Sequence, residues 1–381
     1  MAEQFKNLFN VELIRSAAGH LARQDPRFDS KRFVKLAAQD LDALEMKARA
    51  MQVASALEAT LPEEFERAAS VLEAALAPPY ETERVGELAG TRAVHEEGLA
   101  GWFLWSAGEY VVRRGLDEPE RALRTLHAFT QRFSAEFAIR PFLAKHPSLG
   151  FKTLARWSTD PSLHVRRLVS EGSRPRLPWG LQLKALIADP SPTLPFLRTL
   201  QDDESEYVRR SVANHLNDIA KDHPDVVAEW IERHLPDASD ERRALLRHAS
   251  RTLVKKGHKR TLAAFGLGKA FAGTATLTVT PTKARVGGAV TLEVELRSSA
   301  KKPQTLVVDY AVHHVKADGS TNPKVFKGWK LTLAPGETRS LTKRHSLKPI
   351  TTRRYYAGEH AVSAQANGVE IARTTFRLQL A

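Results

Sequence analysis

Three carboxylates, Glu136, Glu171 and Asp218, stand among arginines in the first 220 residues of the chain. A carboxylate on a basic surface repels an anionic partner, so its presence there needs a chemical reason. One such reason is to stabilise a positive charge that develops during a reaction and to position an attacking water. Hydrolysis of an N-glycosidic bond passes through a positively charged, oxocarbenium-like sugar and has this requirement. These three residues are therefore the candidate catalytic carboxylates.

Trp179 is the fourth candidate catalytic residue. It lies in EGSRPRLPWG, residues 171–180, where glycine, prolines and arginines end a helix. The stiff turn holds the indole near the Glu171 end of that helix. Beside two arginines, the indole is suited to stack on a sugar or a base. The alternative is that Trp179 packs against the helix that follows.

The elements that must position these residues are repeated helices. The phrase DPSLHVRRL begins at residue 160 and DESEYVRRS at residue 203, an offset of 43 residues, and a looser copy, DERRALLRHASRTL, begins at residue 240. This offset is typical of HEAT-type repeats, in which pairs of helices stack. Acidic and serine residues at the beginning of each copy suit a helix start, because they accept hydrogen bonds from free N–H groups. We therefore expect a HEAT-like helical domain over residues 1–268.

Each repeated helix has a polar stripe of residues four apart, which lie on one helical face. When repeats stack, such helices line one concave surface, and its basic residues are suited to bind the DNA backbone. The alternative is that each stripe is only a solvated face. The stripes consist of Arg167 with Glu171, of Arg210 with Asn214 and Asp218, and of Arg247 with Arg251 and Lys255, which Lys256 extends into a basic cluster at residues 255–260.

After a linker of residues 261–272, the period of the apolar residues changes from 3.6 to 2. Seven short alternating segments with turn residues between them predict an antiparallel immunoglobulin-like sandwich over residues 273–381. The expected fold class is thus multidomain, an all-α HEAT-like superhelix followed by an all-β sandwich. The expected strands are Thr274–Thr280, Gly288–Leu296, Gln304–Val315, Pro323–Leu333, Glu337–Leu347, Gly358–Ala366 and Val369–Leu378.

The composition bounds the function. The chain has 381 residues, no cysteine and a formal charge of +13, of which residues 273–381 contribute +10 through 17 Lys and Arg against 7 Asp and Glu. This charge favours nucleic acid as a partner, with the sandwich as a second contact surface. The lack of cysteine excludes disulfides and Cys-ligated zinc, and it fits a cytoplasmic setting. No motif for zinc, nucleotide phosphates or dinucleotides is present, so neither a metal nor a cofactor is expected.

The chain resembles the AlkC-type DNA glycosylases of the HEAT-like alkylation-repair superfamily over essentially its whole length. The larger form of that family has a C-terminal immunoglobulin-like domain, which residues 273–381 match. The resemblance rests on SAEFAIRPFL at residues 134–143, DPSLHVRRLVSEGSRPRLPW at 160–179, YVRRSVANHLNDIAKDHP at 207–224 and RHASRTLVKKGH at 247–258.

The resemblance implies hydrolysis of the N-glycosidic bond of cationic N3-methylated bases, 3-methyladenine and 3-methylcytosine, in double-stranded DNA. It implies base excision repair without full base flipping, by a monomer in the bacterial cytoplasm that associates with the nucleoid when bound to DNA. The base is already cationic, so it leaves without a general acid. Asp218 is expected to stabilise the cation or position water beside Glu136 and Glu171, with Trp179 stacked near the lesion. Arg167 is expected to orient Glu171 or to contact phosphate.

Two other functions remain open at this point. The first is a non-catalytic HEAT-repeat scaffold that binds bent or damaged duplex DNA, which has the same basic charge but excises no base. The second is a HEAT scaffold for protein partners, which predicts an apolar or acidic groove rather than a basic one.

Overall fold

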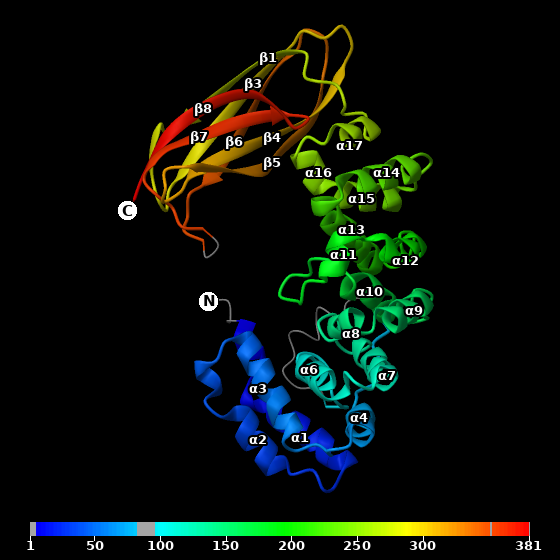
Figure 1. Ribbon diagram of the computed structural model, residues 1–381. Helices are drawn as coiled ribbons and strands as arrows, with labels where there is room; N and C mark the ends of the chain where they lie inside the picture. Colours follow the sequence, from blue (N-terminus) through cyan, green and yellow to red (C-terminus); the bar gives the residue numbers. More distant parts are fainter. Residues whose placement is uncertain (1–4, 82–95, 351–352, 381) are drawn as a thin grey trace. The chain divides into compact units, whose positions relative to one another are not determined.

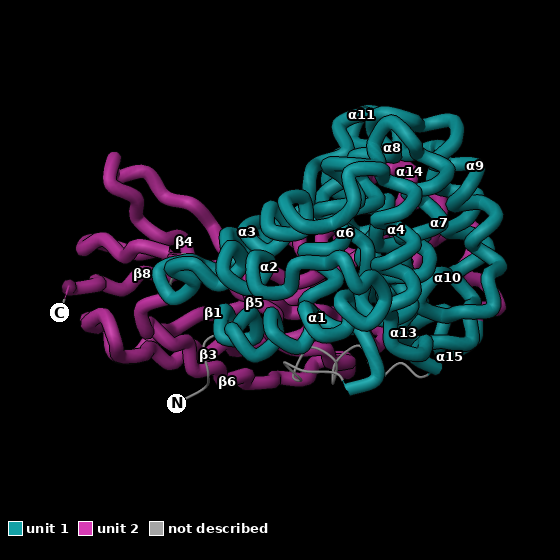
Figure 2. The backbone as a smooth tube through the Cα atoms, turned by 90° about the horizontal axis from the view of Figure 1, so that it is seen from below, with its two compact units in different colours: residues 1–222, 239–249 teal, residues 223–238, 250–381 magenta. Residues whose placement is uncertain are grey.

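The computed structural model describes residues 5–81, 96–350 and 353–380. The chain divides into two compact units, which Figure 2 distinguishes by colour. The first comprises the residues up to 222 together with 239–249, and the second comprises 223–238 together with 250–381. No helix in the described ranges is long and apolar enough to cross a membrane.

The first unit consists of helices, which Figure 1 labels along the chain. Pairs such as α7 with α10 and α10 with α13 pack against each other, as stacked repeats require. The elements are η1 (Phe5–Leu8), α1 (Val11–Gln24), α2 (Ser30–Ala38), η2 (Leu41–Ala43), α3 (Met46–Glu58), α4 (Phe65–Ala74), α6 (Phe103–Gly115), α7 (Pro119–Thr130), α8 (Ile139–Lys145), α9 (Pro147–Trp157), α10 (Leu163–Gly172), α11 (Lys184–Ala188), η3 (Ser191–Thr193), α12 (Leu194–Leu200), α13 (Glu206–Asp222) and α15 (Asp240–Ala249).

The first two copies of the repeated phrase fold alike. Before α10, Asp160 Oδ1 accepts a hydrogen bond from the Ser162 backbone N–H at 2.8 Å. Before α13, Asp203 Oδ1 accepts the equivalent bond from Ser205 at 3.0 Å. In both turns the aspartate satisfies a backbone donor that the helix start would otherwise leave free. The repeat read from the sequence is therefore a repeat of local structure.

The first arginine of each Val-Arg-Arg sequence braces its own turn. Arg166 Nη1 donates to the Asp160 carbonyl oxygen at 2.9 Å, and Arg209 Nη1 donates to that of Asp203 at 2.6 Å. Arg166 also binds both carboxylate oxygens of Asp203, at 2.6 and 3.1 Å, and so joins one repeat to the next. These two arginines have structural roles.

The third copy differs from the expected continuous helix. The chain leaves helical geometry at Ser250, with φ −88° and ψ 0°, and α16 (Arg251–Lys255) begins there. The stripe expected on one helix is therefore divided between α15 and α16. The expected linker at 261–272 also starts too early, because α17 (Lys259–Ala264) extends into it. Helices α16 and α17 belong to the second unit, together with α14 (Pro224–His234), whereas α15 belongs to the first unit.

The rest of the second unit is an antiparallel sandwich, as expected (Figure 1). One sheet has the order β1-β3-β6 and the other β2-β8-β7-β4-β5, with β2 parallel to β8. The seven expected strands are present with small shifts of their ends. The sequence did not predict β2, because three residues are too few to show alternation. The strands are β1 (Gly273–Thr280), β2 (Lys283–Arg285), β3 (Ala289–Ser298), β4 (Gln304–Val315), β5 (Thr321–Leu333), β6 (Thr338–Ser346), β7 (Gly358–Ala366) and β8 (Val369–Gln379).

The core of the sandwich lies between its two sheets. Along β3, buried and exposed residues alternate, and Leu292, Val294 and Leu296 are completely buried. They share one apolar cluster with Val308 and Val312 of β4 in the other sheet. In β3 the period of 2 in the sequence thus separates the core face of the strand from its solvent face.

Candidate functional site

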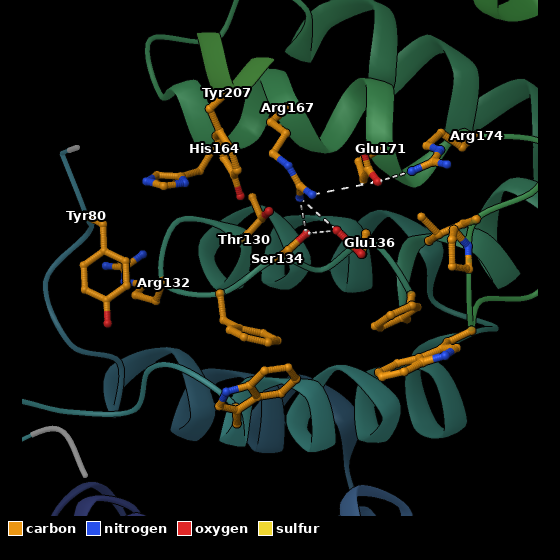
Figure 3. A pocket seen from close by; sticks show the side chains of 16 residues that line it. Tyr80, Thr130, Arg132, Ser134, Glu136, His164, Arg167, Glu171, Arg174 and Tyr207 are labelled. Atoms are coloured by element: carbon orange, nitrogen blue, oxygen red, sulfur yellow. Dashed lines mark hydrogen bonds and ion pairs between the residues drawn. The ribbon is translucent and has the colours of Figure 1, made fainter. Parts of the chain in front are cut away.

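A cavity of about 470 Å³ in the first unit (Figure 3) is lined by three of the four candidate catalytic residues, Glu136, Glu171 and Trp179. The candidate DNA-binding residue Arg167 also lines it, so the stretch around Glu136 and residues 167–179 meet in this cavity. Seven of the sixteen lining side chains carry an aromatic ring, counting His164. The lining residues are Tyr80, Trp102, Thr130, Arg132, Phe133, Ser134, Glu136, Phe137, His164, Arg167, Glu171, Arg174, Leu177, Pro178, Trp179 and Tyr207.

Arg167, on α10, stands at the centre of this cavity. Its Nη1 donates to Glu136 Oε2 at 2.8 Å and to Ser134 Oγ at 3.0 Å. The Ser134 hydroxyl in turn donates to Glu136 Oε2 at 2.8 Å. The guanidinium lies 4.6 Å from the centroid of the Tyr207 ring, a cation–π distance. Glu136 is therefore held in one orientation from two sides and its charge is compensated.

Glu136 is thus not part of a helical pair with Arg140, four residues later. It lies in the turn before α8, and its side chain is mostly buried. Arg140 is completely buried and donates instead to the carbonyl oxygens of Gly172, at 2.8 Å, and Leu181, at 2.5 Å. Burial lowers the pKa of Arg140 to about 10. Arg140 therefore fixes both ends of the loop that contains Trp179.

Glu171, at the end of α10, is held as strictly as Glu136. Its Oε1 accepts from Arg174 Nη1 at 2.6 Å and lies 3.9 Å from Arg167 Nη2. Its Oε2 accepts from the buried Ser211 hydroxyl at 2.6 Å. Burial alone would raise the pKa of Glu171, but the charges of Arg167 and Arg174 and the hydrogen bonds hold it below the usual range. Glu171 is therefore a carboxylate at neutral pH.

Asp218 is connected to this site but does not line the cavity. Its Oδ2 accepts from Arg174 Nε at 2.8 Å, and its Oδ1 accepts from Lys221 Nζ at 2.7 Å. Asp218 is 1% exposed. Because Arg174 binds both Asp218 and Glu171, its guanidinium stands between the two carboxylates. The i, i+4 spacing from Asn214 led us to expect Asp218 on an open basic surface, and spacing alone could not indicate this burial.

Trp179 is 69% exposed and has a φ of 63°. A bulky residue in the left-handed region is strained, and such strain occurs mainly at functional sites. The indole does not pack into the core, so the alternative that it only packs against the next helix is not supported. Its place at the border of the cavity leaves its ring available to a ligand.

The aromatic wall of the cavity was not predicted from the sequence. The Trp102 and Phe133 rings lie 4.9 Å apart, and Trp105 lies behind them, 6.1 Å from Trp102 and 5.2 Å from Phe137. The dense aromatic residues of 102–105 and 133–137 were a usable signal. Tyr80, however, joins the site from a distant segment without any motif.

The other candidate DNA-binding residues lie outside the cavity. Arg210 is exposed on α13 and pairs with Glu206, and Asn214 Oδ1 contacts His248 Nε2 at 2.9 Å. Arg247 is exposed on α15, whereas Arg251, Lys255 and Lys256 belong to the second unit. Within the described residues, no group of three or more His, Asp or Glu side chains is arranged to hold a metal ion.

The chain is similar in sequence to known families and to a curated protein. Residues 115–253 match the family described as "DNA alkylation repair enzyme", and residues 273–380 match the C-terminal Ig-like domain of the uncharacterised protein YhaZ. YhaZ of Bacillus subtilis (strain 168) is 38% identical over 369 residues, which cover 95% of this chain and 96% of YhaZ.

A solved structure is similar over the whole chain. It is the Pseudomonas fluorescens alkylpurine DNA glycosylase AlkC, bound to DNA containing an abasic site analog. The TM-score is 0.87 with 35% sequence identity, and the match covers 99% of this chain and 100% of that one. Together with the helical region and the Ig-like sandwich, these similarities show that the chain belongs to the AlkC-type family of DNA alkylation repair enzymes.

Proposed function

We propose that this chain is a DNA glycosylase that releases 3-methyladenine and 3-methylcytosine from double-stranded DNA as a step of base excision repair. The observation on which the proposal rests is the pair Glu136 and Glu171, two carboxylates that arginines hold in fixed orientations on one cavity wall. The similarity to a glycosylase solved with an abasic-site analogue supports DNA as the ligand.

In the proposed reaction, the bond between C1′ and the base nitrogen breaks and the base takes the electron pair. An N3-methylated base is cationic in DNA, so it leaves as a neutral molecule and requires no general acid. The sugar becomes oxocarbenium-like, and a nearby carboxylate stabilises that charge. Water then bonds to C1′ and its proton passes through a carboxylate to solvent.

Each candidate catalytic residue has a separate proposed role in this reaction. Glu136 and Glu171 face the cavity, so they are the carboxylates proposed to approach the sugar and the water. Asp218 is proposed to act through Arg174, by setting where that guanidinium stands against Glu171. Trp179 is proposed to stack on the lesion nucleotide. The reaction occurs at the sugar, so the base need not be extruded into the protein.

Base release from defined duplexes tests this proposal. Duplexes carry 3-methyladenine, 3-methylcytosine, 7-methylguanine or the neutral damaged base hypoxanthine, and the released base is quantified. We expect release of both N3-methylated bases and none of hypoxanthine, because a neutral base would need a protonating acid. If neither N3-methylated base is released, the non-catalytic scaffold that binds bent or damaged duplex becomes the better account.

A further inference from the structure

Arg132 is a cavity residue to which the reaction proposed above gives no task. It follows α7 in a turn and lines the same cavity as Glu136. Figure 3 places it next to Tyr80, at the end of the cavity away from Glu171 and Arg174. Any group that Arg132 binds would therefore lie in the same cavity as the carboxylates, but beside them.

The Arg132 side chain is fixed by backbone carbonyls. Its Nε donates to the Ala77 carbonyl oxygen at 2.7 Å, and its Nη1 donates to that of Ala128 at 2.8 Å. Its own carbonyl oxygen accepts from the Gly101 backbone N–H at 3.3 Å. Nη2 makes no hydrogen bond within the described part of the chain. Two nitrogens of the guanidinium are thus fixed and the third has no partner among the described residues, so the side chain is preorganised and the entropy cost of binding a ligand is low.

Arg132 also differs in its ion pairing from the other two arginines of the cavity. Arg167 pairs with Glu136, and Arg174 pairs with Glu171 as well as with Asp218. No carboxylate of residues 5–81, 96–350 or 353–380 comes within 4.0 Å of Arg132. Burial lowers the pKa of Arg132, because a half-buried cation is poorly solvated. An anion at this position would relieve that cost.

We propose that Arg132 binds, through Nη2, a phosphodiester of the DNA strand that carries the lesion, beside the nucleotide on which Glu136 and Glu171 act. The inference rests on the proposed function only in taking damaged duplex DNA as the ligand. A planar guanidinium forms short, directional hydrogen bonds to phosphate oxygens. Because phosphate contacts set the position of a strand rather than read its sequence, Arg132 places C1′ opposite the carboxylates.

A scan of single neutral phosphates tests this inference. Duplexes contain a stable abasic-site analogue, and each phosphate flanking it is replaced in turn by an uncharged methylphosphonate. Affinity is measured for the wild-type chain, for Arg132→Gln and for Arg156→Gln, a control at an exposed arginine on α9 outside this cavity. Thermal unfolding establishes that each variant is folded.

For the wild type, we expect one phosphate next to the analogue at which neutralisation weakens binding about tenfold, the size of one charge-assisted hydrogen bond. In Arg132→Gln that loss should disappear, while losses at other phosphates remain. The salt dependence of log affinity should also fall by about 0.9. Arg156→Gln should keep the wild-type pattern at the phosphates beside the analogue.

A wild-type scan without a sensitive phosphate beside the analogue would overturn the inference, as would equal losses in Arg132→Gln at every phosphate. If Arg132→Gln is unfolded, Arg132→Lys replaces it, because lysine keeps the charge but lacks the planar fork of donors that binds two carbonyls and a phosphate in fixed directions. The tenfold loss should then shrink to threefold or less, and an unchanged loss overturns the inference. The assay measures binding to an uncleavable analogue, so a failure to release bases would not alter its result.

Discussion

Replacing Asp218 by asparagine removes a buried negative charge and leaves the side-chain shape nearly unchanged. The carboxylate binds Arg174 at 2.8 Å and Lys221 at 2.7 Å and is 1% exposed. Asparagine can accept only one of these bonds with its oxygen, and its NH₂ group faces the other cation. A buried hydrogen bond to a charged group contributes about 1.5–3 kcal/mol, so we expect the free energy of unfolding to fall by about 2 kcal/mol.

The same substitution should slow base release. Arg174 would lose one of its two carboxylate partners, and its position against Glu171 would no longer be fixed. We expect a decrease of at least about tenfold in the single-turnover rate, which corresponds to about 1.4 kcal/mol of barrier. The assay uses enzyme in excess over a 3-methylcytosine duplex, and urea unfolding measures stability in the same buffer.

Asp222→Asn is the matched control, because Asp222 is also on α13 and binds Arg176 through both oxygens, at 2.7 and 2.8 Å, outside the cavity. This exposed pair should contribute little to stability, and its loss should leave the rate unchanged. If Asp218→Asn is folded and releases base at the wild-type rate, the connection from Asp218 through Arg174 to Glu171 has no part in the reaction.

Three further outcomes are expected. Trp179→Ala should leave the unfolding midpoint unchanged, because the indole is exposed. It should weaken binding to an abasic-analogue duplex about tenfold, and unchanged binding would exclude stacking. Lys255→Gln combined with Lys256→Gln should weaken binding to lesion and intact duplexes equally. It should also reduce the slope of log affinity against log salt concentration by about 1.8. A changed preference for the lesion would argue for base contacts. Burial lowers the pKa of His314 to about 3 and that of His345 to about 4. Below the ordinary histidine pKa of about 6.5, the unfolded chain therefore binds more protons than the folded chain, and the free energy of unfolding should fall as the pH is lowered from 6.5 to 4. A urea midpoint that stays constant over this range would contradict the prediction.

Local signals in the sequence predicted much of the fold. The duplicated aspartate-serine turns predicted both helix starts, because Asp160 and Asp203 each satisfy a backbone donor within two residues. The alternation of apolar residues predicted seven strands, most clearly β3, in which alternate residues are buried and exposed. The break at Ser250 was not predictable, because the 3.6-residue period continues through it and serine is tolerated within a helix.

The site was only partly predictable for a similar reason. The spacing of Glu171 and Asp218 indicates which helical face each occupies but not what covers that face. Arg174, which stands between them, comes from a loop, and the position of that loop depends on the buried Arg140. Such contacts join distant segments, so the burial of Asp218 and the place of Tyr80 required the structure.

The most direct test of the account is the single-turnover rate of 3-methylcytosine release from a duplex by the wild-type chain, beside Glu136→Gln and Glu171→Gln. The wild type should release the base well above the spontaneous rate. Each variant should be slower by at least about tenfold, because glutamine keeps the shape but not the charge that stabilises the cationic sugar. Release at the wild-type rate by both folded variants, or no release by the wild type, would contradict the claim that these carboxylates perform the hydrolysis.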